Sequence, residues 1–365
     1  MRAALLETQG KPLALRDDVE IRDPGPGQVR VRVAHCGLCH SDLSAVDGAF
    51  PCPTPIVLGH EAAGVVESVG ANVRSVAPGD PVVLTPCPPC GRCYWCVRGE
   101  PAHCELSLGI MTHAFPDGST GLSRRGEKVL RGLNVGGFAE YALLSETGVV
   151  RVPKDAPLDV VCVIGCAVQT GVGAVLNTAR VEEGATVLVL GLGGIGLSVV
   201  QGARVAGAAR ILAVDPVAER RDAAKAMGAS DCIDPSSEDL QARVREIAPV
   251  GVDYAFECAG RAKLVEAGLA ATRSGGTIVA VGAPPLGESI TIAPAAAFTV
   301  SGKRLLGCIL GSSNSLREIP RLVSLWKAGR LDLESLVTQR RPLAEINAAL
   351  DDLRASRGIR TVLDC

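Results

Sequence analysis

The segment Gly191-Leu192-Gly193-Gly194-Ile195-Gly196 constrains the fold of this 365-residue chain more than any other feature. It follows an apolar run, Thr186–Leu190, and opens an apolar helical stretch that continues to about Ala206. Glycines at these spacings allow a tight turn and a close approach of the backbone to a pyrophosphate, which the N-terminus of the following helix attracts. The pattern therefore predicts a dinucleotide-binding βαβ unit.

Asp215, at the end of the next strand-like run, bears on which dinucleotide is bound. A carboxylate there would accept hydrogen bonds from the hydroxyl groups of the adenine ribose and would repel a 2′-phosphate. We therefore expect NAD rather than NADP. Arg220 and Arg221 lie nearby and either contact the ribose or are simply solvated. A tight strand-to-helix turn without a nucleotide is the alternative.

Two patterns of apolar residues divide the chain. Between Thr186 and Val281, strand-length apolar runs alternate with Ala-rich helical stretches, which predicts a parallel sheet with crossover helices. The first part, to about Val152, has short strands broken by glycine and proline and predicts an irregular β-rich domain. After about Leu310, a helical stretch (319–328) and a short apolar run (361–363) lack the alternation. We assign them to the first domain.

Four of the fourteen cysteines form a C-x2-C-x2-C-x7-C pattern. They are Cys90, Cys93, Cys96 and Cys104. Four thiolates within one short loop suit a tetrahedral zinc ion that is closed to substrate. An iron–sulfur cluster and a reduced surface loop are the alternatives.

Three other residues have the side-chain types that a zinc ion with one open position takes from a protein. They are Cys39, His60 and Cys166, in the motifs Cys39-His40-Ser41-Asp42, Gly59-His60-Glu61 and Gly165-Cys166. Their spacing alone does not show that they meet, because a single Cys or His is more often a packed core residue.

Charge and hydropathy exclude other classes of partner. The net charge of −2 gives no basic field for nucleic acid or an anionic membrane surface. Apolar runs are strand-length, well short of the roughly 20 residues that span a bilayer. The N-terminus, Met1 to Gly10, lacks an export pattern, so we expect a cytoplasmic protein.

These motifs together resemble the zinc-dependent medium-chain alcohol dehydrogenases, over essentially the whole chain up to Ile359-Arg360-Thr361. The resemblance implies an α/β protein in which a GroES-like β-rich catalytic domain is split around a Rossmann domain with a doubly wound parallel sheet. We expect the catalytic domain over 1–166 and 311–365, with a structural zinc lobe at about 87–105, and the NAD-binding domain over 167–310.

The resemblance also implies residue roles. Cys39, His60 and Cys166 would hold a catalytic zinc, and the four lobe cysteines a structural zinc, giving two ions per chain. Ser41 would hydrogen-bond the alcohol oxygen, Asp42 would orient the zinc-bound histidine, and Glu61 would lie behind the zinc. Coenzyme contacts would come from the glycine-rich turn and Asp215, and from His40 and Arg360 at the pyrophosphate, Thr170 at the nicotinamide and Arg220 at the adenine ribose.

The expected reaction is reversible hydride transfer between a small alcohol and NAD, giving an aldehyde or ketone. The long stretch between Cys104 and Cys166 is similar to that of the dimeric branch of the family, so we expect a homodimer. Ser44 stands where many members have a histidine that passes protons to solvent, which leaves the exit route open. The alternatives are a non-zinc NAD(P)H reductase of the same superfamily and a zinc-stabilised nucleic-acid-binding module. The sequence does not indicate which alcohol is the substrate.

Overall fold

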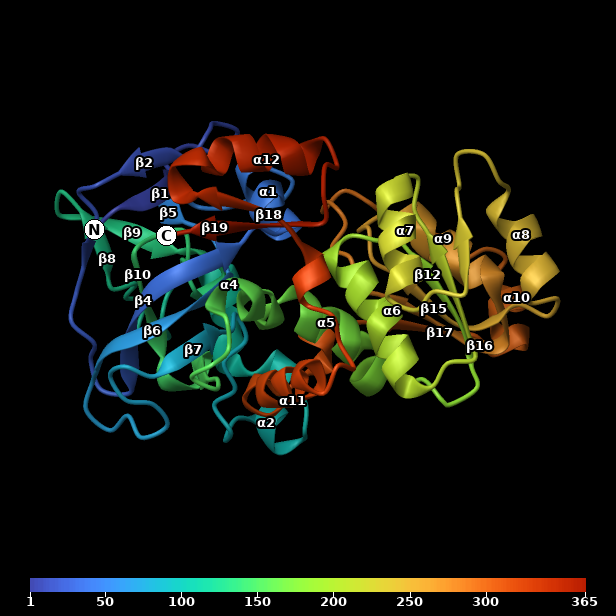
Figure 1. Cartoon of the computed structure of the whole chain (residues 1–365), viewed down its shortest axis with the longest axis horizontal. Helices are drawn as coiled ribbons and strands as arrows, with labels where there is room; N and C mark the ends of the chain where they lie inside the picture. The colour runs from blue at the N-terminus through green and yellow to red at the C-terminus, as the bar shows by residue number, and fades with distance from the viewer. The chain divides into compact units, whose positions relative to one another are not determined.

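The computed structural model describes residues 1–365, apart from the side chain of Leu108. The chain divides into two compact units (Figure 1). The first contains Met1–Gln169 and Ser313–Cys365, and the second contains Thr170–Ser312. The divisions therefore fall at 169/170 and 312/313, a few residues after the positions 166/167 and 310/311 expected from the sequence.

The first unit is organised around β4 (Gln28–Gly37), which pairs antiparallel with β6 (Glu61–Val69), β10 (Tyr141–Ser145) and β19 (Arg360–Asp364). In the first half of β4, valines at alternate positions are buried in the core, while the arginines between them point outward. This alternation has the period of a strand with one covered face. The last strand of the chain thus lies beside one of the earliest (Figure 1).

The other elements of the first unit complete two sheets and their connections. The sheet of β4 has the order β11-β7-β6-β4-β19-β18, with β10 also on β4, and includes β7 (Pro81–Leu84), β11 (Val149–Arg151) and β18 (Val337–Pro342). The second sheet has the order β2-β1-β5-β9-β8-β3, with strands at Ala14–Arg16, Ala3–Leu6, Ile56–Val57, Glu127–Arg131, Leu122–Arg124 and Glu20–Ile21.

The helices of the first unit are mostly short. They are α1 (His40–Asp47), α2 (Tyr94–Val97), α3 (Gly109–Thr112), α4 (Leu158–Val161), α11 (Ser315–Lys327) and α12 (Ile346–Arg354). Single 3₁₀ turns are η1 (Pro101–His103), η2 (Glu105–Leu108), η3 (Gly132–Asn134), η4 (Glu146–Gly148), η5 (Cys162–Gly165), η8 (Glu334–Leu336) and η9 (Leu343–Glu345). Helix α5 (Ala167–Gly173) crosses the division between the units.

The second unit is built on a parallel sheet with the order β14-β13-β12-β15-β16-β17. Its strands are β12 (Thr186–Leu190), β13 (Arg210–Val214), β14 (Asp231–Ile233), β15 (Val252–Glu257), β16 (Thr272–Ala280) and β17 (Arg304–Gly307). Counted along the unit this order is 3-2-1-4-5-6, the doubly wound arrangement of dinucleotide-binding sheets. The predicted fold class, a β-rich unit with a doubly wound parallel sheet, is confirmed.

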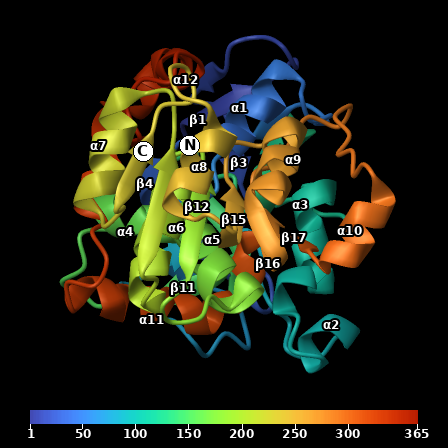
Figure 2. The same cartoon turned by 90° about the vertical axis from the view of Figure 1, so that its right-hand side faces the viewer.

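Helices cover both faces of this sheet (Figure 2). α6 (Gly194–Ala206) packs over β12 and β13 and against α7 (Ala218–Ala226). α9 (Ala262–Ala271) packs over β15 and β16 and against α8 (Leu240–Ile247). The unit also contains α10 (Ala295–Ser301), the π-helical segment η6 (Ala174–Ala179) and η7 (Leu310–Ser312).

No single helix in the described part of the chain is long and apolar enough to cross a bilayer, although the bent pair Leu158–Gly165 and Ala167–Ala179 passes the test when taken together.

Candidate active site

Strand register brings three distant motifs of the first unit together. Gly37, at the end of β4, pairs with Glu61 on β6 and with Val362 on β19. Because both pairings are antiparallel, the residues that follow β4 lie beside those that precede β6 and β19. Cys39 therefore lies next to His60 on one side and near Arg360 on the other.

A first cluster of potential metal ligands forms where these segments meet. The ligand atoms of Cys39, His60, Glu61 and Cys166 all lie within 4.8 Å of one another. Cys166 arrives from η5, which packs so closely on β7 that a Cβ at Gly165 would collide with the carbonyl oxygen of Leu84. Cys39, His60 and Cys166 are the predicted catalytic ligands. Glu61, expected only behind the metal, lies as close as they do.

The carboxylate of Asp42 holds this cluster in place from a fully buried position. Its Oδ2 accepts the Cys39 N–H at 3.1 Å, and its Oδ1 accepts the Gly59 N–H at 2.9 Å and lies 3.2 Å from Nδ1 of His60. Since a carboxylate only accepts, Nδ1 carries the proton of the imidazole, and Nε2 keeps its lone pair for a metal.

Glu61 and Arg360 form a buried ion pair behind the cluster. Arg360 Nε lies 3.4 Å from Glu61 Oε2, and Arg360 Nη1 donates to the Leu38 carbonyl oxygen at 2.7 Å. A Cβ at Gly37 would lie 2.6 Å from Glu61 Oε2, which explains why this strand position is a glycine. Arg360 is only 5% exposed, so in the first unit its guanidinium faces Glu61 rather than solvent.

Electrostatics of the cluster favour a bound cation. Burial raises the pKa of Glu61 to about 7, against the attraction of Arg360. Neither oxygen of Glu61 has a hydrogen-bond partner among the described residues, which is costly for a buried carboxylate. Hydrogen bonding from Cys166 holds the pKa of Cys39 well below its usual range. Two sulfurs, an imidazole and an unsatisfied carboxylate fit a zinc ion chemically.

The first turn of α1 carries the predicted proton-transfer residues. Ser41 Oγ lies 3.8 Å from Cys39 Sγ, at the edge of the cluster. His40 begins the helix and is exposed, while Ser44 lies one turn beyond Ser41 and is half-buried.

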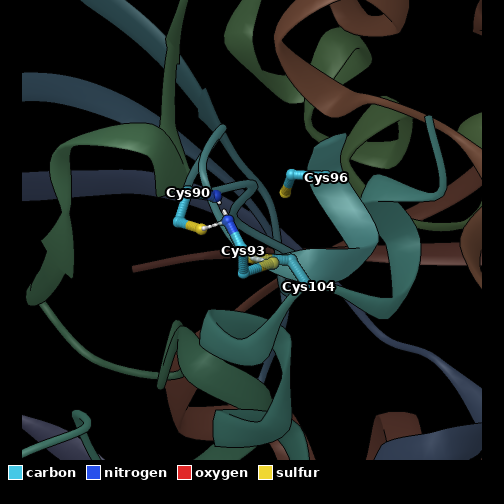
Figure 3. Close-up of side chains that lie close together, drawn as sticks. All are labelled: Cys90, Cys93, Cys96 and Cys104. Atoms are coloured by element: carbon cyan, nitrogen blue, oxygen red, sulfur yellow. Dashed lines mark hydrogen bonds between the residues drawn. The ribbon is translucent and has the colours of Figure 1, made fainter. Parts of the chain in front are cut away.

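A second cluster contains the four predicted lobe cysteines, Cys90, Cys93, Cys96 and Cys104, whose sulfurs lie within 4.8 Å of one another (Figure 3). The Cys93 and Cys104 sulfurs are 3.8 Å apart. A tetrahedral site with Zn–S bonds of about 2.3 Å separates its sulfurs by about 3.8 Å.

Backbone groups in the lobe solvate these sulfurs. The Cys90 and Leu106 N–H groups donate to Cys104 Sγ at 3.1 and 3.4 Å, and the Cys93 N–H donates to Cys90 Sγ at 3.3 Å. Backbone donors at Cys96 and Glu105 lower the pKa of Cys93 to about 6. Burial, by contrast, raises the pKa of Cys96 and raises that of Cys104 to about 12, so a bound cation would be needed to hold all four sulfurs as thiolates, and a closed zinc site suits the lobe.

The glycine-rich turn of the second unit has the predicted geometry for a dinucleotide loop. Gly191 has a φ of +91°, and a Cβ at Gly196 would collide with the Gly191 carbonyl oxygen. A Cβ at Gly193 would meet no atom of the described chain within 4 Å. The backbone is therefore closely packed at Gly196 and has open space beside Gly193. Gly194 and Ile195 follow in the first turn of α6.

Asp215 is fixed against this turn. Its Oδ2 accepts the Leu192 N–H at 2.8 Å, and its Oδ1 accepts the Val217 N–H at 2.9 Å. Arg220 lies 4.0 Å from the carboxylate. Arg221 instead donates to the Asp215 carbonyl oxygen and pairs with Asp234 at 3.1 Å, so of the two arginines only Arg220 lies beside the predicted ribose-binding carboxylate. Thr170 is buried in α5.

Glu257 was missed at the sequence level. It lies fully buried at the end of β15, where its Oε1 accepts the Ala259 and Arg261 N–H groups and its carbonyl oxygen accepts those of Val281 and Gly282. It thereby joins the loops that follow β15 and β16. The sequence signal that could have identified Glu257 is a carboxylate at the end of an apolar run, which is also the pattern at Asp215.

Comparisons with known proteins agree with this architecture. Residues 25–154 match the alcohol dehydrogenase GroES-like domain, and residues 194–325 match the zinc-binding dehydrogenase domain. A zinc-binding domain protein of the alcohol dehydrogenase type from Burkholderia ambifaria is 38% identical, with 100% of this chain and 98% of that chain covered and a TM-score of 0.94.

Two further solved structures are similar over 100% of this chain. Benzyl alcohol dehydrogenase from Acinetobacter calcoaceticus is 34% identical, with 98% of that chain covered and a TM-score of 0.93. A zinc-binding dehydrogenase from Sinorhizobium meliloti, solved with bound NADP, is 29% identical, with 99% covered and a TM-score of 0.82. With both domains matched and full-length relatives above 30% identity, the chain belongs to the zinc-dependent medium-chain alcohol dehydrogenase family.

Proposed function

We propose that this chain is an NAD-dependent zinc alcohol dehydrogenase, which transfers hydride reversibly between an alcohol and the nicotinamide ring. The observation that carries the proposal is the cluster of Cys39, His60 and Cys166, in which Asp42 binds Nδ1 of His60 and leaves Nε2 for a metal. A non-zinc reductase of the same superfamily would need neither this cluster nor the cysteine lobe. The presence of both favours the zinc enzyme.

The two clusters would hold two zinc ions with different roles. The four lobe cysteines would close a structural site, while Cys39, His60 and Cys166 would leave a position for substrate. Zinc at that site would act as a Lewis acid that lowers the pKa of the substrate hydroxyl. Asp42 keeps the imidazole and the Cys39 backbone oriented, so little reorganisation is needed when a substrate binds.

Ser41 is the first group that can take the proton of the alcohol. Its hydroxyl lies at the edge of the cluster, 3.8 Å from Cys39 Sγ. It can accept from the substrate and donate onward to a coenzyme hydroxyl. Ser44 cannot act as a base near neutral pH, so the exposed His40 or water would complete the path to solvent.

Coenzyme preference rests on Asp215. Each of its oxygens accepts one backbone N–H and retains capacity for a ribose hydroxyl. Its charge disfavours a 2′-phosphate. Arg220 lies 4.0 Å from the carboxylate, while Arg221 binds the Asp215 carbonyl oxygen and pairs with Asp234. We therefore propose NAD for this chain, although one relative binds NADP.

Primary aromatic alcohols are the first substrate class to screen, because a full-length relative at 34% identity is a benzyl alcohol dehydrogenase.

We also propose a homodimer. Large apolar side chains are exposed in the connection between β16 and the edge strand β17, with Leu286 72% and Val300 89% exposed. Exposed apolar groups and an unpaired strand edge both favour burial against a second copy.

The two zinc sites should respond differently to loss of one ligand. Cys93→Ser should harm folding, because structural zinc contributes on the order of 10 kcal/mol in small peptides. Cys166→Ser should keep the fold and abolish turnover. Zinc content, thermal unfolding and NADH formation measure the three effects, with Cys232→Ser, outside both clusters, as the control. Active protein without zinc, or normal folding and turnover in both variants, would contradict the assignment.

Asp215→Gly should lower the ratio of kcat/KM for NAD to kcat/KM for NADP. Removing hydrogen bonds from a charged acceptor costs about 1.5–3 kcal/mol, so kcat/KM for NAD should fall roughly 10–100-fold. Asp215→Asn, which keeps an acceptor without the charge, separates the loss of charge from the loss of backbone hydrogen bonds. A wild-type enzyme that uses NADP as efficiently as NAD would contradict this role of Asp215. It would indicate that Arg220 binds the 2′-phosphate.

Ser41→Ala should lose about 10²–10⁴-fold in kcat, the usual cost of removing a positioned proton-transfer group. The variant should still bind zinc and NAD, and Ser41→Thr, which keeps the hydroxyl, should recover most of the rate. The primary deuterium isotope effect must be measured alongside, because slow NADH release can hide a chemical defect. Wild-type turnover in Ser41→Ala, with hydride transfer shown to be rate-limiting, would rule out this proton path.

A further inference from the structure

Hydrophobic burial contributes little to α2, the helix that carries Cys96 in the cysteine lobe. None of its side chains is buried, and Tyr94 and Val97 are 62% and 75% exposed. A short segment that buries so little apolar surface does not fix its shape by packing alone. The arrangement of the four sulfurs therefore depends on a metal and on how the chain is held where it enters and leaves the lobe.

The side chain of Asn134 joins the two ends of the lobe. Its Nδ2 donates to the carbonyl oxygen of Pro86, before the lobe, at 2.9 Å and to that of Leu106, after the lobe, at 3.1 Å. An amide nitrogen carries two hydrogens, so both are used. The N–H of Leu106 in turn donates to Cys104 Sγ at 3.4 Å. Asn134 thus holds a residue that itself contacts a predicted metal ligand.

The guanidinium of Arg131 fixes the orientation of this amide. Its Nη1 donates to the Asn134 carbonyl oxygen, and its Nη2 donates to Asn134 Oδ1 at 3.4 Å. A guanidinium only donates and carbonyl oxygens only accept, so Oδ1 faces Arg131 and Nδ2 faces the ends of the lobe. Arg131 is only 3% exposed and forms no ion pair with a described carboxylate. Both of its described hydrogen bonds go to Asn134.

The backbone at Asn134 has a conformation that few residues adopt. Leu133 and Asn134 have φ values of +50° and +65°, in the left-handed region that is unfavourable for leucine. Such strain persists only where the surrounding structure enforces it. A Cβ at Gly109 would collide with Asn134 Oδ1, so the segment after the lobe packs directly on the amide. The turn therefore holds the Asn134 side chain firmly between the two ends of the lobe.

We propose that Asn134, oriented by Arg131, is a positioning residue that preforms the structural metal site. The inference rests on the proposed function, in which the four lobe cysteines hold a zinc ion. Closing the chain between Pro86 and Leu106 costs conformational entropy. Because Asn134 already joins these ends, that cost is not part of metal binding, and the lobe binds zinc more tightly. The hydrogen bonds of Asn134 and Arg131 involve no ligand of the first cluster, whose affinity is independent of them.

Asn134→Gly tests this role without straining the backbone, because glycine adopts the left-handed conformation at no steric cost. The net contribution of one hydrogen bond corresponds to about a fivefold change in an equilibrium constant, so loss of both should raise the Kd of the lobe for zinc roughly 20–30-fold. The Kd of the first cluster should stay unchanged.

The full-length protein is equilibrated in zinc buffers set by a chelator, and a brief pulse of iodoacetamide then labels the thiols that hold no metal. Mass spectrometry of the peptides that contain the half-buried Cys90 and Cys96 gives the zinc occupancy of the lobe. Total bound zinc minus this occupancy gives the occupancy of the first cluster.

Asn72→Gly is the matched control. Asn72 is an exposed asparagine with a φ of +69°, so the substitution makes the same change at another left-handed position. The Kd of the lobe should equal that of the wild type. Asn134→Asp keeps the shape of the side chain and the acceptor that faces Arg131 but lacks both donors. It should raise the Kd of the lobe at least as much as Asn134→Gly does.

Two results would overturn the proposal. A wild-type Kd of the lobe in Asn134→Gly, even with a lower Tm, would show that Asn134 only stabilises the fold, and the zinc assignment would stand. A wild-type lobe that zinc does not protect from iodoacetamide would reject the zinc assignment itself and the inference with it. If Asn134→Gly does not fold, the same measurement on Asn134→Asp decides the question.

Discussion

The buried carboxylate of Asp42 is the contact on which the proposed chemistry depends. It accepts hydrogen bonds from the backbone of Cys39 and Gly59 and from the ring of His60, and so fixes two motifs that are about twenty residues apart. A carboxylate with all these donors is satisfied without solvent, which is why it tolerates complete burial. Without it, neither the tautomer of His60 nor the direction of its Nε2 would be set.

Buried charge is handled in different ways within the first unit. Arg360 and Glu61 compensate each other behind the first cluster, and the unsatisfied oxygens of Glu61 face a group of metal ligands. In the lobe, backbone N–H groups donate to the sulfurs of Cys90 and Cys104, and the four cysteine sulfurs lie close together, with no described ion pair that places a cation of the chain beside them. Arg131 has neither kind of compensation in the chain, which distinguishes it from the other buried ionic groups near the two clusters.

Local patterns in the sequence predicted much of the second unit. The run Thr186–Leu190 coincides with β12, and α6 ends at Ala206 as expected, because an apolar period and a glycine-rich turn are short-range signals. The closeness of Glu61 to the metal ligands was expected only from the family resemblance, not from any local pattern. It follows from the pairing of Gly37 with Glu61 and Val362, and strand register between distant segments is not encoded in local periodicity. The pairing of Arg360 with its counter-charge Glu61, far away in the chain, could not be read from local patterns for the same reason.

The central claim is that Cys39, His60 and Cys166 hold a zinc ion that keeps a position open for substrate. Diffraction data collected on both sides of the zinc absorption edge, from crystals of the purified protein, test it most directly. The account predicts two anomalous peaks per chain, one among the four lobe cysteines and one bonded to Cys39 Sγ, His60 Nε2 and Cys166 Sγ. A single peak in the lobe, or a second zinc ion fully enclosed by four protein ligands with Glu61 as the fourth in both the free and the substrate-bound enzyme, would contradict it.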